Sequence, residues 1–128
     1  MMPVGNRLGR GEGFDDTIRR GRRFGDKRMV LHYLAPSETS AGEPLVGITV
    51  AKRQIPLAHD RNRVKRQLRH LLHDRLEAMP NGAKVVVRAL RGAGGLSSDE
   101  LGASLDRLLI RAMGDAERPA KPQTRERK

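Results

Sequence analysis

The feature that most constrains this chain is a nine-residue segment, 61–69, that is both strongly basic and regularly spaced. It reads Arg-Asn-Arg-Val-Lys-Arg-Gln-Leu-Arg, and five of its nine residues are cations. Val64 and Leu68 are four residues apart, which places them on one side of an α-helix. A solvated run of charge would not need apolar residues at that interval. The segment therefore predicts a helix that packs on a core through one apolar stripe and holds its cations on a fixed surface.

This helix is expected to continue to about Ala78, where residues 79–82, Met-Pro-Asn-Gly, stop it. Asp60 is a candidate for its N-cap. At about 100° per residue, the apolar stripe consists of Val64, Leu68, Leu71, Leu72 and Leu76. One polar sector holds Asn62, Lys65, Arg66, Arg69 and His73, and another holds Arg63, Gln67, His70 and Asp74. An ordinary solvated helix face is the alternative, but no acid lies inside the basic segment to neutralise it.

The overall charge points to a polyanionic partner. The chain has 26 basic and 15 acidic residues, a formal net charge of +11, which favours nucleic acid or an anionic membrane surface. Six of the cations are Lys and 20 are Arg. The planar guanidinium group of Arg grips phosphate with two hydrogen bonds and stacks on bases. Nucleic acid is therefore the favoured partner.

Hydropathy and cysteine usage argue against a membrane-spanning protein and against cysteine-based chemistry. No apolar run approaches the roughly 20 residues needed to span a bilayer, and the first ten residues lack the apolar segment of a signal peptide. The absence of cysteine excludes disulfides, thiolate catalysis and cysteine-based zinc sites. A cytoplasmic protein without a membrane partner is expected.

The rest of the chain predicts one α+β domain, residues 9–113, between an irregular lead-in, 1–8, and a disordered basic tail, 114–128. The expected order is α-β-β-β-α-β-α. Strands 28–34 and 45–51 should pair as an antiparallel hairpin, because only a short loop separates them. Val85-Val86-Val87 indicates a buried strand. Ser97 and Glu100 are spaced to form a capping box at the start of a last helix that ends at Gly114.

No catalytic constellation is visible in the sequence. The chain has no G-x-S-x-G, Walker or H-E-x-x-H motif. His70 and His73 are three apart on a predicted helix and could form a metal pair. However, no third ligand has suitable spacing, and Arg66 and Arg69 add positive charge nearby. Neither a catalytic residue nor a metal site is expected in this chain.

The basic segment resembles the signature of the bacterial ribonuclease P protein subunit. The resemblance extends over roughly residues 6–112 in the same order. It includes Asn6-Arg7-Leu8, Phe14, Gly21-Arg22, the strand 47–53 that ends in a basic pair, and the strand 85–89. It implies a sandwich fold with a left-handed βαβ crossover, whereas about 98% of such crossovers are right-handed. It also implies a subunit of an endonuclease that removes the 5′ leader of precursor tRNA.

In this family the catalytic centre belongs to the RNA subunit, and bound Mg²⁺ supports hydrolysis. The resemblance implies two partners, the RNA subunit and precursor tRNA, and no obligatory protein partner is evident. The expected contacts with the RNA subunit come from Arg61, Asn62, Arg63, Lys65, Arg66 and Arg69. The expected contacts with the leader come from Phe14, Ile18, His32, Lys52 and Arg53. Ile18 and His32 stand where aromatic residues are common in the family, and Leu45 stands where a basic residue is frequent.

Two other functions compete with this hypothesis. The first is a non-catalytic ribosomal or other structural RNA-binding protein, which would bind rRNA and leave precursor tRNA unaffected. The second is a DNA-binding helix module, which would need a neighbouring helix at a short turn. Pro56 and a strand precede the basic helix instead, which disfavours the DNA-binding module.

Overall fold

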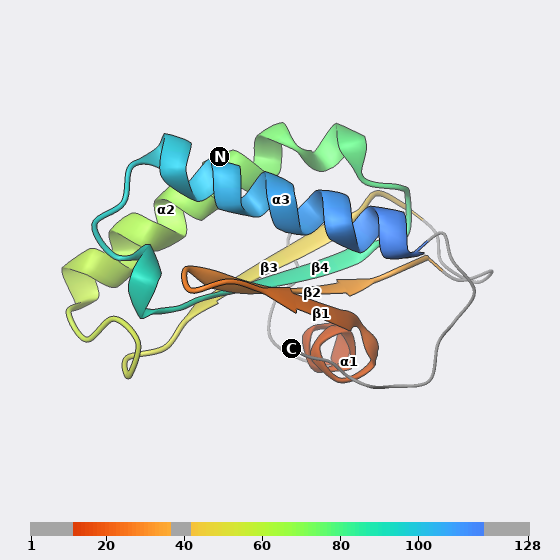
Figure 1. The fold of residues 1–128 in the computed structure, drawn as a ribbon. Helices are drawn as coiled ribbons and strands as arrows, with labels where there is room; N and C mark the ends of the chain where they lie inside the picture. Colours follow the sequence, from red (N-terminus) through yellow and green to blue (C-terminus); the bar gives the residue numbers. More distant parts are fainter. Residues whose placement is uncertain (1–11, 37–41, 117–128) are drawn as a thin grey trace.

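The computed structural model describes residues 12–36 and 42–116, which fold around one four-stranded sheet. The elements follow the predicted order α-β-β-β-α-β-α. They are α1 (Glu12–Arg20), β1 (Arg22–Gly25), β2 (Met29–Leu34), β3 (Leu45–Val50), α2 (Ala58–Asp74), β4 (Lys84–Ala89) and α3 (Ser98–Ala116), with 3₁₀ turns at Leu76–Ala78 and Arg91–Ala93. Figure 1 shows three layers, in which α2 and α3 cover one face of the sheet and α1 lies on the other.

Two predicted helix ends differ from the structure. The regular α2 helix stops at Asp74, and a separate 3₁₀ turn occupies Leu76–Ala78. At the other end of the fold, α3 continues to Ala116, two residues beyond the expected end at Gly114. The predicted lead-in, 1–8, and the tail from residue 117 lie outside the described residues.

The predicted hairpin between β2 and β3 is wrong. The strand order is β1-β2-β4-β3, so β4 lies between them, antiparallel to β2 and parallel to β3. The reason lies in the composition of β4, where Val85, Val86 and Val87 are all 0% exposed. A strand that is apolar on both faces is most stable at the centre of a sheet that is covered on both sides. The antiparallel hairpin that does form joins β1 and β2.

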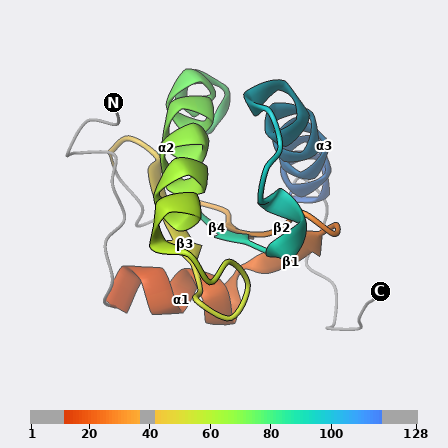
Figure 2. The same cartoon turned by 90° about the vertical axis from the view of Figure 1, so that its left-hand side faces the viewer.

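The connection from β3 through α2 to β4 is a left-handed crossover. In Figure 2 β3 lies to the left of β4, and α2 lies above them and begins at the end of the sheet nearest the viewer. Both strands point toward the viewer, since they are parallel and α2 follows β3 directly. This is the hand that the family resemblance implied, against the general preference.

The core lies between the sheet and the layer formed by α2 and α3. On α2 the predicted stripe is confirmed by Val64, Leu68 and Leu72, which are at most 1% exposed, while Leu71 and Leu76 pack at its edge. The four core leucines of α3 (Leu101, Leu105, Leu108 and Leu109) are at most 3% exposed. This packing fixes the rotation of α2 and therefore which of its residues face outward.

A close approach of α2 and α3 holds the two helices together. A Cβ atom on Gly102 would lie 3.2 Å from both the Arg75 Nη2 atom and the Leu71 Cδ2 atom, so a glycine suits this position. Arg75 donates hydrogen bonds from Nε and Nη2 to the two carboxylate oxygens of Asp106, at 2.6 and 3.1 Å. This bidentate pair raises the pKa of Arg75 and ties the end of α2 to the middle of α3.

The start of α3 is capped as predicted, but the start of α2 is not. Ser97 and Glu100 form the capping box, in which the Glu100 amide donates to Ser97 Oγ at 3.1 Å and the Ser97 amide donates to Glu100 Oε1 at 3.0 Å. Leu57 occupies the N-cap of α2 and makes no side-chain cap. Asp60 lies inside the first turn instead, where its charge still suits the helix dipole.

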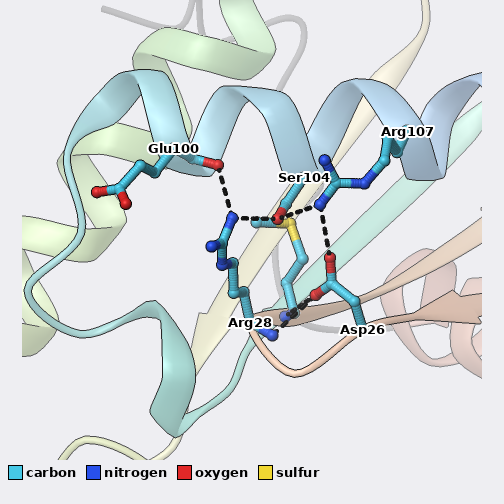
Figure 3. A network of polar contacts seen from close by, with 6 residues as sticks. Asp26, Arg28, Glu100, Ser104 and Arg107 are labelled. Carbon is cyan, nitrogen blue, oxygen red and sulfur yellow. Dashed lines mark hydrogen bonds and ion pairs between the residues drawn. The ribbon is translucent and has the colours of Figure 1, made fainter.

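A polar network, shown in Figure 3, fastens α3 to the β1–β2 turn. Asp26 accepts backbone hydrogen bonds from Arg28 and Met29 through Oδ1, at 2.8 and 3.0 Å, and its Oδ2 atom lies 3.7 Å from Arg107 Nη2. Arg28 Nη1 donates to Ser104 Oγ at 3.1 Å and to the Glu100 carbonyl oxygen at 3.3 Å. These contacts fix α3 against the sheet, and α3 in turn supports α2.

Candidate nucleic-acid interface

The outer face of α2 carries a group of unneutralised cations. Asn62, Arg63, Arg66 and Arg69 are exposed, and Lys65 is half-buried beside the core stripe. Within the described part of the chain, none of the four cations among them, Arg63, Lys65, Arg66 and Arg69, forms an ion pair. Elsewhere the fold does pair its cations, for example Arg20 with Asp16 and Arg75 with Asp106. We call these five residues, Asn62, Arg63, Lys65, Arg66 and Arg69, the α2 cationic face.

Arg61 was predicted to contact RNA with the others, but the structure gives it an internal role. Its Nη1 atom donates hydrogen bonds to the carbonyl oxygens of Ile55 and Pro56, at 3.1 and 2.7 Å. These contacts fasten the loop that precedes α2, residues 51–57, onto the first turn of the helix. The side chain is half-buried, so Arg61 offers less of its guanidinium group to a ligand than Arg66 or Arg69.

Gln67, whose spacing places it in a polar sector of α2, connects this helix to the start of α3. Its Nε2 atom donates to the Leu96 carbonyl oxygen at 3.0 Å and to Ser98 Oγ at 3.3 Å. Its Oε1 atom is buried without a hydrogen-bond partner. Gln67 thus ties the middle of the basic segment to the start of α3, on the side of α2 away from Lys65. No local sequence pattern indicates this contact, because it joins residues about 30 positions apart.

The opposite face of the sheet is covered by α1. Phe14 is 7% exposed and Thr17 is 0% exposed, while Ile18 is half-buried. Gly21 permits the close contact at the end of α1, because a Cβ atom there would lie 2.4 Å from the Thr17 carbonyl oxygen and 2.9 Å from that of Tyr33. Phe14 is therefore mainly a packing residue of this layer in the free chain.

His32 lies on β2, in register with Arg23 on β1 and Val86 on β4. It is 3% exposed, and neither ring nitrogen has a hydrogen-bond partner. Burial, together with the positive charges of Arg88 and Arg23, lowers the pKa of His32 to about 4. The imidazole is consequently neutral at physiological pH.

Lys52 and Arg53 are exposed in the loop that joins β3 to α2. The five residues predicted to contact the leader thus differ widely in accessibility. The two basic residues are open to solvent, Ile18 is partly open, and Phe14 and His32 are buried. Of these five residues, only Lys52, Arg53 and the edge of Ile18 are therefore directly accessible to a ligand in the free chain.

The described residues contain no group of three or more His, Asp or Glu side chains placed to hold a metal ion. His70 and His73 are exposed on α2. Among the same residues, no helix is long and apolar enough to cross a membrane.

Comparisons with known proteins agree with this architecture. A family model described as ribonuclease P matches residues 2–113. A ribonuclease P protein component of Streptomyces bikiniensis is 45% identical in an alignment of 125 residues, and the match covers 92% of this chain and 100% of the relative. One from Corynebacterium diphtheriae is 39% identical and covers 85% of this chain and 94% of its own length.

Solved structures show the same fold at low sequence identity. The RNase P protein of Staphylococcus aureus superposes with a TM-score of 0.70 at 20% identity, over 84% of this chain and 94% of that one. The RNase P protein of Thermotoga maritima gives 0.64 at 20% identity, over 77% and 89%. The three-layer arrangement is thus shared by proteins whose sequences have diverged strongly.

Proposed function

The chain belongs to the ribonuclease P protein family, protein components of an endoribonuclease of tRNA processing, and on that premise we propose how it contacts its two RNA partners. The α2 cationic face binds the RNA subunit, and Lys52, Arg53 and the α1 layer bind the 5′ leader of precursor tRNA. The observation that carries this proposal is the set of unneutralised cations on a helix whose rotation the core fixes.

The geometry of α2 suits a phosphate backbone. Arg63, Arg66 and Arg69 follow one another at three-residue intervals and are exposed, so their guanidinium groups lie along one helix. Side chains held on a packed helix lose less freedom on binding than side chains on a mobile arm. Each phosphate that they neutralise releases counterions, which makes the affinity strongly dependent on salt.

The leader is a single strand, which proteins bind through backbone phosphates and the faces of bases. Lys52 and Arg53 supply exposed charge for its phosphates, and Ile18 supplies a partly exposed apolar edge. Phe14 on α1 and His32 on β2 are both buried, and α1 packs against β2. We propose that these two residues shape the surface under the leader.

We propose that Mg²⁺ is held mainly by the RNA subunit and the substrate. The described residues do not bring three metal-ligating side chains together, so no step of the hydrolysis is assigned to them. The chain's own contribution is to bind and orient RNA. A non-catalytic ribosomal or structural RNA-binding role is not favoured by the family match.

Reconstitution tests the proposal. At low Mg²⁺, adding the purified chain to the RNA subunit from the same organism should restore cleavage of precursor tRNA. The gain should be larger for a substrate with a leader of several nucleotides than for one with a single-nucleotide leader. A chain that binds the RNA subunit without restoring cleavage would contradict the proposed function, as would a gain that is independent of the leader.

A further inference from the structure

The loop that precedes α2, residues 51–57, is held in one conformation by contacts at several points. The amides of Gln54 and Ile55 both donate to the Ala51 carbonyl oxygen, at 3.0 and 3.1 Å. The Ile55 side chain is 5% exposed and belongs to the core. Arg61 holds the carbonyl groups of Ile55 and Pro56. The loop is thus a pre-formed support for the residue at its end, Leu57.

The side chain of Leu57 is 65% exposed. Among the described residues, the only other large hydrophobic residue classed as exposed is Ile110 on α3, at 69%. Leu57 makes no side-chain cap for α2, and the residue of this loop that enters the core is Ile55. Neither capping nor burial in the fold therefore accounts for a leucine at this position.

The surroundings of Leu57 in the chain are cationic. The α2 cationic face begins five residues after it, at Asn62. Pro56 beside it is also exposed. A partner that fits this surface must combine negative charge with a small apolar face. RNA offers both where an unpaired nucleotide presents its base outside a helix.

We propose that Leu57, supported by Pro56, packs against the face of an unpaired base of the RNA subunit, within the interface of the α2 cationic face. This inference rests on the proposed function and adds an apolar anchor to it. Anchors of this kind are effective because they are already ordered before binding. The surrounding cations position the phosphates, and the leucine removes apolar surface from water.

The test compares Leu57→Ala with Ile110→Ala, a matched loss of exposed apolar surface on α3. Affinity for the RNA subunit is measured over a range of salt concentrations with the full chain. Leu57→Ala should weaken binding by roughly tenfold at every salt concentration, because it removes an apolar contact and no charge. Ile110→Ala should bind like the unmodified chain. Leu57→Phe should bind at least as tightly as the unmodified chain, because a ring stacks on a base.

Four results would overturn the proposal. Leu57→Ala could bind the RNA subunit with unchanged affinity, or it could lose no more affinity than Ile110→Ala does. Either result would reject the apolar anchor but would leave the proposed function standing. Leu57→Ala could instead change the salt dependence, which would show that it disturbs the cations rather than a base contact. If the unmodified chain itself did not bind the RNA subunit, the proposed function would fail together with this inference.

Discussion

Leu68→Ala should lower the free energy of unfolding by roughly 2–5 kcal/mol. Leu68 is 0% exposed and belongs to the core between α2 and the sheet. Alanine would remove three carbon atoms from a closely packed site and leave a cavity that neighbouring side chains fill only in part. Chemical denaturation followed by circular dichroism measures the change.

Arg69→Ala is the matched control, because it changes the next residue of the same helix on the exposed side. Its free energy of unfolding should stay within about 0.5 kcal/mol of the unmodified chain. Equal losses of stability in the two variants would show that α2 is not rotated as the structure has it. The division of α2 into a buried face that anchors the helix and an exposed face that is proposed to bind RNA would then be wrong.

Acid should destabilise the chain through His32. The pKa of His32 is lowered from 6.5 to about 4 in the folded state, so the unfolded chain binds a proton there that the folded chain does not. Stability from this group is fully present above pH 6.5 and falls as the pH drops toward about 4. One pKa unit is about 1.4 kcal/mol, so the loss over this window is roughly 2–3 kcal/mol after allowance for solvent screening.

The measurement is the free energy of unfolding between pH 4 and 7 for the unmodified chain and for His32→Phe. The difference between the two profiles isolates His32, because all other groups titrate in both proteins. We expect the difference to grow as the pH falls through this window. His70→Gln, which changes an exposed histidine on α2, should leave the profile unchanged. Parallel profiles for the unmodified chain and His32→Phe would contradict a buried, neutral imidazole.

Local patterns predicted the helices and strands and the buried stripe of α2 well. The spacing of Val64, Leu68 and Leu72 was sufficient, because a helix that buries one stripe must expose the opposite side. The capping box at Ser97 and Glu100 was equally local, since both of its hydrogen bonds span three residues. Such features depend on sequence neighbours, which the chain displays directly.

Features set by distant contacts were not predictable in the same way. The pairing of β2 and β3 with β4 depends on which strand fills the centre of the sheet, and proximity in the chain indicated a hairpin instead. The left-handed crossover came from the family resemblance alone. The burial of His32 under α1 and the internal role of Arg61 depend on packing and on a loop conformation that no spacing rule specifies.

We propose that this chain attaches to RNA through the exposed cations of α2. The most direct test is the salt dependence of binding to the RNA subunit, measured for the unmodified chain and for a variant that carries Arg66→Ala and Arg69→Ala. If both guanidinium groups neutralise phosphates, the variant should bind more weakly, and the slope of log K against log salt should become shallower by about two. An unchanged affinity and slope in a folded variant would contradict the claim.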